Sequence, residues 1–305
     1  MAAALIGLDW GSSNCRAFRI ARDGAVIETR ETAKGIFAVE GGDFAGAFAA
    51  LVGDWREAHP EAPVLMSGMI GSRQGWVEAP YVELPADAAT LAAALAPVPD
   101  HVARIVPGLA GPALAGGRDV MRGEETQIVG ALDALDRGSG VLCLPGTHSK
   151  WVRVERGRIM SFATFMTGEV YGVLRAHSIL GRLMHGDAHD AAAFADGIAR
   201  GRGESGLLHQ LFAVRTDGLF DAKPPTALAS FLSGLLIGHE IRAARKAMPA
   251  DRVVLVGAPA LTQLYRDALA VEQIAATIVP GDAAAARGLS HIAQKAGVFS
   301  IMRRD

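Results

Sequence analysis

The stretch LIGLDWGSSNCRAF at residues 5–18 decides the fold of this chain. An apolar run that ends at Asp9 is followed by a polar turn and by a second apolar run, residues 15–20. The turn consists of Gly11, Ser12, Ser13 and Asn14. This pattern predicts two strands joined by a tight turn, and residues 25–31 predict a third strand. We therefore expect the chain to open with an antiparallel meander.

The turn at residues 11–14 has two interpretations. Its glycine and hydroxyl groups can expose several backbone N–H groups to a phosphate. Asp9, next to them, is then placed to hold Mg²⁺, an ion that prefers a few carboxylates together with phosphate oxygens. The alternative is an ordinary hairpin turn that uses these residues for their turn propensity. Taken alone, the turn does not decide between the two.

A similar pattern opens the second half of the chain. Strands are expected at residues 141–144, 151–155 and 158–165, and the turn after the first of them reads LPGTHSKW. That turn contains Gly146, Thr147, His148, Ser149 and Lys150. A solvated lysine and a structural histidine are the alternatives here, but two such turns favour a nucleotide held in a cleft between two related domains. The chain contains no P-loop motif.

Two adjacent carboxylates lie between these turns, in DVMRGEETQIVGAL at residues 119–132. Glu124 and Glu125 begin a predicted helix, where acidic residues are favoured by the helix dipole. An ordinary helix start is therefore one interpretation. The other is that one carboxylate accepts a proton from a substrate hydroxyl that attacks the γ-phosphate. Spacing does not choose between the two residues, because one position rotates a side chain by about 100° around a helix.

Composition limits the class of protein. The chain is 50% hydrophobic and 20% charged, which excludes intrinsic disorder, and its two cysteines exclude a disulfide scaffold. A net charge of −2 gives no basic field, so nucleic acid is not an expected partner. We find no targeting signal and no apolar stretch of roughly 18 residues, so no membrane is expected either. Unpaired cysteines fit a reducing compartment, and we expect a cytoplasmic protein.

Glycine is unusually frequent, with 36 of the 305 residues, against roughly 7% in average usage. Glycine is needed where the backbone turns sharply or approaches a ligand closely. Part of the excess lies in the turns above, and GLAGPALAGG at residues 108–117 predicts a glycine-rich loop. The composition therefore suggests close approach of backbone to a ligand.

The order of these motifs resembles the actin/hexokinase/Hsp70 ATPase superfamily, and more closely the 2-dehydro-3-deoxygalactonokinase family. Beyond RGEETQ and LPGTHSKW, the strings SGMIGSRQGW (67–76), FMTGE (165–169) and FLSGLLIG (231–238) carry this resemblance, which runs essentially end to end. It implies ATP-dependent phosphorylation of 2-dehydro-3-deoxy-D-galactonate at its 6-hydroxyl in galactonate catabolism, with ATP and Mg²⁺ as cofactors.

The resemblance also implies an α/β fold of two ribonuclease H-like or actin-like ATPase domains that flank a nucleotide cleft. We expect an N-terminal domain with the acceptor site at residues 1–137. A C-terminal domain with the second phosphate turn and the adenosine site is expected at residues 138–305. Whether the closing helix, residues 283–297, packs back on the first domain stays open.

The resemblance assigns roles to individual residues. Asp9 and residues 11–14 correspond to the first phosphate motif, and residues 146–150 to the second. Gly257 and Gly281 are assigned to the cofactor site, where Gly257 would approach the adenosine and Gly281 would lead the closing helix. Glu124 or Glu125 takes the place of the catalytic carboxylate. The acceptor is an anionic 2-keto acid, so its site needs a cation or converging amides. Candidate acceptor contacts are Arg16, Ser67, Gly68, Met69, Ser72, Trp76, Arg122, Thr167 and Glu169, with Arg73 as a further cation.

Several alternatives remain at the level of sequence. Arg16 suits a salt bridge at a strand edge, and Trp76 suits a partly buried core position. A phosphohydrolase, a nucleotide-sensing binding protein, and a kinase for a related 2-keto-3-deoxy sugar acid are the other functions considered. The expected partner is a small-molecule sugar acid, and a homodimer stays open.

Overall fold

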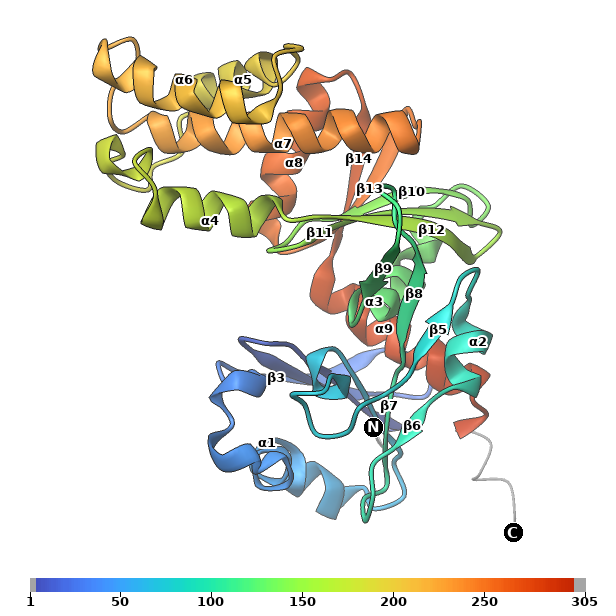
Figure 1. Ribbon diagram of the computed structural model, residues 1–305. Coiled ribbons are helices and arrows are strands. Elements are labelled where there is room, and N and C mark those ends of the chain that lie inside the picture. Colours follow the sequence, from blue (N-terminus) through green and yellow to red (C-terminus); the bar gives the residue numbers. More distant parts are fainter. Residues whose placement is uncertain (1–3, 299–305) are drawn as a thin grey trace. The chain divides into compact units, whose positions relative to one another are not determined.

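The computed structural model describes residues 4–298 (Figure 1). Contacts within the chain divide it into two units. Unit 1 comprises Met1–Ser139, Arg153–Phe162 and Val279–Asp305, and unit 2 comprises Gly140–Val152 and Ala163–Ile278. The domain boundary expected after residue 137 stays a prediction.

A six-stranded sheet forms the centre of unit 1, with the strand order β3-β2-β1-β4-β7-β6. The strands are β1 (Leu5–Trp10), β2 (Cys15–Ile20), β3 (Val26–Thr32), β4 (Val64–Ser67), β6 (Ala96–Pro97) and β7 (Ala103–Ile105). β2 pairs antiparallel with both β1 and β3, so the expected meander is confirmed. β1 also pairs in parallel with β4 and therefore lies inside the sheet, which explains its apolar sequence.

Four helices accompany this sheet among the described residues of unit 1: α1 (Phe44–Ala58), α2 (Ala88–Ala93), α3 (Glu124–Ala131) and α9 (Gly281–Lys295). α3 and α9 lie side by side although they are far apart in sequence (Figure 1). A Cβ on Gly130 would lie 1.9 Å from the carbonyl oxygen of Ala284, and one on Gly288 would lie 1.9 Å from that of Thr126. Glycine at both positions therefore lets the two backbones touch, which fixes the helix that starts at Glu124.

A small three-stranded sheet completes unit 1, in the order β5-β8-β9. Its strands are β5 (Tyr81–Glu83), β8 (Gly108–Pro112) and β9 (Arg118–Met121). The loop expected at residues 108–117 is therefore wrong for its first half, which forms strand β8, whereas residues 113–117 are the turn between β8 and β9. A Cβ on Gly108 would lie 2.6 Å from the ring of Tyr81, so glycine here makes room for a side chain of the neighbouring strand.

A five-stranded sheet has the order β12-β11-β10-β13-β14, and most of it lies in unit 2. Its strands are β10 (Gly140–Leu144), β11 (Ser149–Glu155), β12 (Arg158–Phe165), β13 (Arg252–Gly257) and β14 (Ala275–Pro280). The first four strands repeat the order β3-β2-β1-β4, and β10 runs parallel to β13 as β1 does to β4. The expected similarity between the openings of the two halves is confirmed.

Unit 2 contains five α-helices among its described residues. They are α4 (Thr167–His177), α5 (Ala191–Arg200), α6 (Leu207–Leu219), α7 (Leu228–Ala247) and α8 (Pro259–Val271). Two of them, α5 and α7, pack as closely as α3 and α9. α5 and α7 lie side by side (Figure 1), and a Cβ on Gly234 would lie 2.0 Å from the carbonyl oxygen of Phe194.

Short 3₁₀ turns lie in both units, at Ile36–Ala38, Glu40–Gly42, Met69–Gly71, Leu132–Ala134 and Gly181–Leu183.

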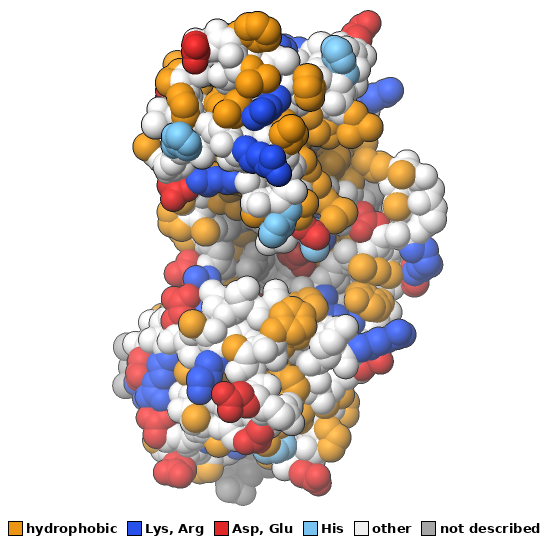
Figure 2. All heavy atoms as spheres, turned by 60° about the vertical axis from the view of Figure 1, so that its left-hand side comes forward, with side chains coloured by type: hydrophobic (Ala, Val, Ile, Leu, Met, Phe, Trp, Pro, Cys, Tyr) orange, Lys and Arg blue, Asp and Glu red, His pale blue; other side chains and the backbone are white. Residues whose placement is uncertain are grey.

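The surface carries charges of both signs. On the face shown in Figure 2, lysine and arginine side chains alternate with acidic ones, and no area of a single sign dominates. This agrees with a net charge of −2. Within residues 4–298, no helix combines the length and the apolar character that crossing a membrane requires.

Candidate functional site

Asp9 lies near the end of β1, opposite Arg16 of β2 and Ser67 of β4. Its side chain is half-buried, and the amide of Gln127 donates a hydrogen bond of 3.4 Å to the Oδ2 atom. Desolvation raises the pKa of Asp9 to about 6, although Gln127 and Arg16 act in the opposite direction. Neighbouring residues therefore stabilise the negative charge of this carboxylate only in part. A cation bound next to it would stabilise that charge further, because a nearby opposite charge favours the ionised form.

The turn after β1 is fixed by the backbone of residues 35 and 36. The Gly11 N–H donates to the Asn14 carbonyl over 2.9 Å, and the Gly35 N–H donates to the Ser13 carbonyl over 3.1 Å. A Cβ on Gly35 would lie 2.2 Å from the carbonyl oxygen of Ser12, so only glycine allows this contact. Ser12 and Ser13 remain exposed. The turn is thus held in place from one side while its hydroxyl groups face solvent.

The two carboxylates at the start of α3 differ in environment. Glu125 is 0% exposed, and its Oε2 atom accepts a hydrogen bond of 2.7 Å from the Gly123 N–H. Burial, together with the charge of Glu124, raises the pKa of Glu125 to about 8. Glu124 is half-buried, accepts a hydrogen bond of 3.0 Å from the Arg122 N–H, and acts on the charge of Asp9. Of these two carboxylates, Glu124 is the one whose charge affects the pKa of Asp9 and whose side chain is partly accessible to solvent.

Two glycines with positive φ bring three segments of unit 1 together. Gly68 has a φ of 96°, and a Cβ there would lie 2.7 Å from the carbonyl oxygen of Trp10. Gly123 has a φ of 109°, and its Cβ would lie 3.1 Å from the Cα of Gly68. The end of β1, the start of the 67–76 loop and the start of α3 therefore meet, although β1 and α3 are more than a hundred residues apart in the sequence.

The remaining residues of the 67–76 loop lie in three environments. Ser67 is buried, and its hydroxyl donates to the Leu8 carbonyl over 3.4 Å. Ser72 is also buried, and its hydroxyl has no hydrogen-bond partner among the described residues. Met69 and Trp76 pack against the core of unit 1, where the Trp76 ring lies 4.9 Å from that of His101. Ser72 is therefore a buried residue of this loop whose hydroxyl has unused hydrogen-bonding capacity.

The three candidate cations, all arginines, differ in how many of their hydrogen-bond donors already have a partner. Arg16 pairs with Glu31 at 3.0 Å, and the exposed Arg73 pairs with Glu78 at 2.9 Å. Arg122 is 9% exposed and donates from Nη2 to the Ala79 carbonyl over 2.8 Å. Its Nε and Nη1 atoms are buried without a hydrogen-bond partner within residues 4–298. Arg122 is thus a buried guanidinium with unsatisfied donors.

In unit 2 the second turn packs on the start of α4. The Glu169 N–H donates to the Thr147 carbonyl over 3.0 Å, and the Glu169 carboxylate pairs with the imidazole of His148. A Cβ on Gly168 would lie 2.4 Å from the carbonyl oxygen of Gly146. Glu169 and the adjoining Gly168, and with them the start of α4 at Thr167, therefore lie against the turn at residues 146–148, whereas Thr167 and Glu169 were expected at the acceptor.

A cavity of about 280 Å³ opens beside this turn within unit 2, close to the lower end of the roughly 300–1,000 Å³ usual for ligand pockets. Its lining includes Gly146, Thr147, Gly168, Leu261 and Leu264. The leucines belong to α8, which follows Gly257 at the end of β13. Gly281, the other glycine singled out from the sequence, is the buried first residue of α9 in unit 1.

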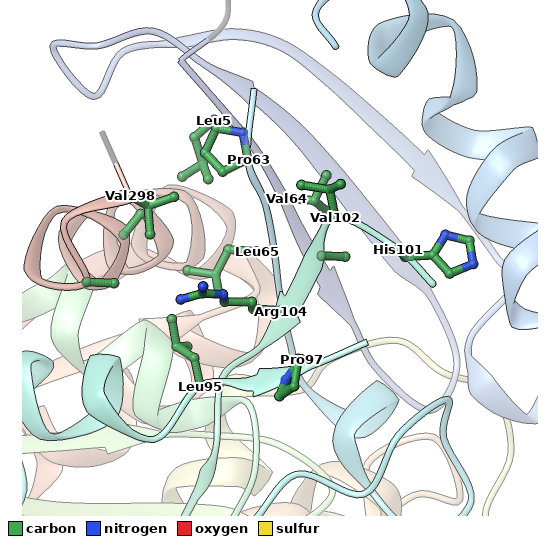
Figure 3. A pocket seen from close by; sticks show the side chains of 13 residues that line it. Leu5, Pro63, Val64, Leu65, Leu95, Pro97, His101, Val102, Arg104 and Val298 are labelled. Atoms are coloured by element: carbon green, nitrogen blue, oxygen red, sulfur yellow. The ribbon is translucent and has the colours of Figure 1, made fainter. Parts of the chain in front are cut away.

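Another cavity, of about 360 Å³, lies in unit 1 beside β4, β7 and α9 (Figure 3). Its lining is mostly apolar, with His101 and Arg104 as the exceptions labelled in Figure 3. None of the predicted site residues lines it. Within residues 4–298, no three His, Cys, Asp or Glu side chains gather as a ready-made set of metal ligands.

Sequence reasoning missed one polar group near the second turn. Glu240 of α7 is 3% exposed and accepts a hydrogen bond of 2.7 Å from the indole N–H of Trp151 and another of 2.7 Å from the Tyr265 hydroxyl. The surrounding string FLSGLLIGHE gives an apolar helix pattern, and the partners lie 89 and 25 positions away. No local signal could have identified this cluster.

Comparison with known proteins places the chain in a family. The model of the family described as 2-keto-3-deoxy-galactonokinase matches residues 9–292. The 2-dehydro-3-deoxygalactonokinase of Escherichia coli (strain K12) is 37% identical over 294 residues, 96% of this chain and 98% of that protein. A probable 2-dehydro-3-deoxygalactonokinase of Rhizobium meliloti (strain 1021) is 40% identical over 298 residues, 94% of this chain and 95% of that protein.

Solved structures agree. The crystal structure of a candidate 2-dehydro-3-deoxygalactonokinase from Sinorhizobium meliloti matches with a TM-score of 0.90 and 37% identity, over 98% of this chain and 100% of that one. The activator of the 2-hydroxyisocaproyl-CoA dehydratase from Clostridium difficile, solved with bound ADPNP, matches with a TM-score of 0.56 and 13% identity, over 99% and 98%. At that identity the second match shows the fold alone, and the expected α/β fold of actin-like ATPases is confirmed. The chain belongs to the 2-keto-3-deoxy-galactonokinase family.

Proposed function

We propose that the protein transfers the γ-phosphoryl group of ATP to the 6-hydroxyl of 2-dehydro-3-deoxy-D-galactonate. The observation that carries this proposal is the meeting of Asp9, Glu124 and the 67–76 loop in unit 1, because phosphoryl transfer needs a charge-organising carboxylate, a base and an acceptor site. The names of relatives 37% and 40% identical over nearly the whole chain support the choice of acceptor.

Glu124 is the proposed base. It would accept the proton of the acceptor hydroxyl while that oxygen attacks the γ-phosphorus and the bond to the β–γ bridging oxygen breaks, so that ADP leaves. Its half-buried side chain can reach a ligand, whereas the Glu125 carboxylate is buried and bonded to the Gly123 N–H. Glu125 would therefore hold the turn that orients Glu124.

Asp9 is the proposed residue for Mg²⁺, directly or through water. The fit rests on the partly compensated charge of this carboxylate and on its place beside the exposed turn at residues 11–14. Mg²⁺ is usually bound by one or two carboxylates together with phosphate oxygens, so a single aspartate beside a phosphate turn is a suitable donor set. When bound, the ion would neutralise charge on the phosphates. Gln127 would orient the Asp9 carboxylate through their hydrogen bond.

Arg122 is the proposed anchor for the carboxylate of the acceptor. Arg16 and Arg73 are engaged with Glu31 and Glu78, whereas two nitrogens of Arg122 lack partners within the described chain. A guanidinium binds a carboxylate through two parallel hydrogen bonds, and buried donors gain most from finding such a partner. The hydroxyl of Ser72, also without a partner among the described residues, would bind a second polar group of the acceptor.

The second turn and the neighbouring cavity of unit 2 are proposed to bind ATP. The backbone of residues 146–148 would face the phosphates, and the leucines of α8 would contact the adenosine. The Ser149 hydroxyl is turned inward to Tyr265, so Ser149 would contribute its backbone only. Thr167 and Glu169 would support this turn, as their contacts with residues 146–148 suggest.

ADP release with and without a sugar acid tests the proposal. We expect release that depends on 2-dehydro-3-deoxy-D-galactonate and is faster than with the gluconate-derived isomer. ADP release that needs no acceptor would indicate a phosphohydrolase, and ATP binding without ADP release would indicate a nucleotide sensor.

A cytoplasmic location is proposed as well, because Cys15 and Cys143 are free and buried.

A further inference from the structure

A buried polar cluster lies next to the second turn in unit 2. We call Glu240, Trp151, Tyr265 and Ser149 the Glu240 cluster. One carboxylate oxygen of Glu240 accepts from Trp151 and the other from Tyr265, both over 2.7 Å. The Tyr265 hydroxyl lies 2.9 Å from that of Ser149. All four side chains are at most 3% exposed, so the hydrogen bonds form out of contact with water.

The cluster holds the segment that leaves the second turn. Ser149 and Trp151 are the first and third residues of β11, and alternate residues of a strand face the same side. Both therefore point toward Glu240, while Lys150 between them faces the other side of the sheet. Any shift of Ser149 or Trp151 would move Lys150 and the backbone of the turn with it.

The other side of the turn is tied to the same carboxylate through α4. The side chain of Thr167, at the start of α4, counteracts the effect of burial on the pKa of Glu240 and therefore faces this carboxyl group. Its neighbours Gly168 and Glu169 touch the carbonyl groups of Gly146 and Thr147. One buried group thus connects α7 with the exit of the turn and with the helix against which the turn packs.

Core packing alone gives no reason for a carboxylate at this position. Burying a carboxyl group is unfavourable unless hydrogen bonds satisfy it, and apolar residues of similar volume often serve stability as well or better. Burial raises the pKa of Glu240, and the side chains of Thr167, Trp151 and Tyr265 counteract that effect. The carboxyl group instead accepts hydrogen bonds in fixed directions from Trp151 and Tyr265, and Trp151 belongs to the strand that leaves the turn.

We propose that Glu240 is a positioning residue for nucleotide binding, which acts through Trp151, Tyr265 and Thr167 to hold the second turn in the shape that receives the phosphates of ATP. The inference rests on the proposed function in one respect, namely that this turn binds ATP. Glu240 itself would touch neither ATP nor the acceptor.

Glu240→Gln and Tyr265→Phe test this inference, with Ile241→Val as the matched control. Ile241 is the next residue of α7 and is 0% exposed, so this control perturbs the same buried helix and core but removes none of the hydrogen bonds of the Glu240 cluster. We would measure the Kd for Mg²⁺-ATP by calorimetry without acceptor, both KM values, and the Tm of each variant. Tyr265→Phe removes only a hydroxyl group, so it keeps the test available if Glu240→Gln folds poorly.

The expected result is an increase of about tenfold in the Kd and KM for ATP in Glu240→Gln, which corresponds to the loss of one charge-assisted hydrogen bond. The KM for the acceptor should stay within about twofold, and Tyr265→Phe should shift ATP binding in the same direction. Ile241→Val should lower the Tm without changing either KM. Unchanged ATP binding in Glu240→Gln and Tyr265→Phe, or equal changes in both KM values, would overturn the inference. Weakened ATP binding in a protein that phosphorylates no sugar acid would uphold it and reject the proposed function instead.

Discussion

The Gly123 N–H donates a hydrogen bond of 2.7 Å to the Glu125 carboxylate, two residues further along the chain. This bond uses one oxygen of Glu125, and the Thr126 hydroxyl donates to the other over 3.2 Å. Glu125 is thereby committed to the backbone turn that begins α3, while its neighbour Glu124 keeps a half-buried side chain near Asp9. Glu124 and Glu125 are adjacent in the sequence but lie in different environments. We therefore expect substitutions at the two positions to have different effects on activity.

The first prediction concerns this pair. Glu124→Gln should reduce kcat by about 10²- to 10⁴-fold, the usual contribution of a general base, while the Kd for ATP stays within about twofold. Glu125→Gln should keep a larger share of the activity, because it alters the support of the turn and not the base. Steady-state kinetics and calorimetry of both variants measure this. Full activity of Glu124→Gln, or a greater loss in Glu125→Gln, would contradict the assignment.

The second prediction concerns stability and pH. The pKa of Glu125 is raised from 4.5 to about 8, so between these values the folded protein keeps a proton that the unfolded chain has lost. The free energy of unfolding should therefore fall as the pH rises through this window, by up to about 1.4 kcal/mol per pH unit for one group. Urea unfolding at several pH values should show that the free energy of unfolding falls less steeply with pH in Glu125→Gln than in the unchanged protein. Equal slopes in the two proteins would refute this prediction.

The third prediction concerns the acceptor. Arg122→Met should raise the KM for the sugar acid by about 10- to 100-fold, because a charge-assisted hydrogen bond contributes about 1.5–3 kcal/mol, and should leave the KM for ATP nearly unchanged. Arg73→Met is the matched control, since Arg73 is exposed and pairs with Glu78. If Arg73→Met has the larger effect on the acceptor, the anchor is misassigned. Arg122→Lys should restore little, because a lysine cannot form the paired hydrogen bonds.

The fourth prediction concerns Asp9. Asp9→Asn should raise the Mg²⁺ concentration needed for the half-maximal rate by at least about tenfold, since even outer partners of metal ligands change affinity by 10–100-fold. The same change removes a carboxylate whose pKa is raised to about 6 by desolvation, so the Tm near neutral pH should rise. Activity and stability should therefore move in opposite directions. A variant with an unchanged Mg²⁺ requirement would argue against this role for Asp9.

The strands around the first turn could be predicted because their signal is local. β1 and β2 are apolar runs separated by a polar turn, and their observed bounds differ little from the expected ones. The hairpin β8–β9 was missed because its glycines suggested a loop. In the structure Gly108 and Gly111 lie within strand β8, where they make room for Tyr81 and Leu84 of the adjoining segment. This use of glycine depends on a neighbouring strand that composition does not reveal.

In the candidate site as well, some residues could be predicted from local motifs, whereas their environments could not. Asp9, Glu124 and Glu125 were found from local motifs, but their different burial depends on how α3 packs on α9 and on the backbone of Gly68. The distinction among Arg16, Arg73 and Arg122 depends on partners that only the folded chain supplies. Glu240 lies on a helix that reads as apolar core, so its role as a hydrogen-bond acceptor has no counterpart in the sequence pattern.

In the proposed reaction, the γ-phosphoryl group of ATP goes to the 6-hydroxyl of 2-dehydro-3-deoxy-D-galactonate. Phosphorus NMR of a reaction with ATP, Mg²⁺ and this acid measures that directly. We expect a new phosphate monoester whose phosphorus couples to the two hydrogens of carbon 6, formed in the same amount as ADP. Inorganic phosphate as the only new phosphorus product, or an ester at another carbon, would contradict it.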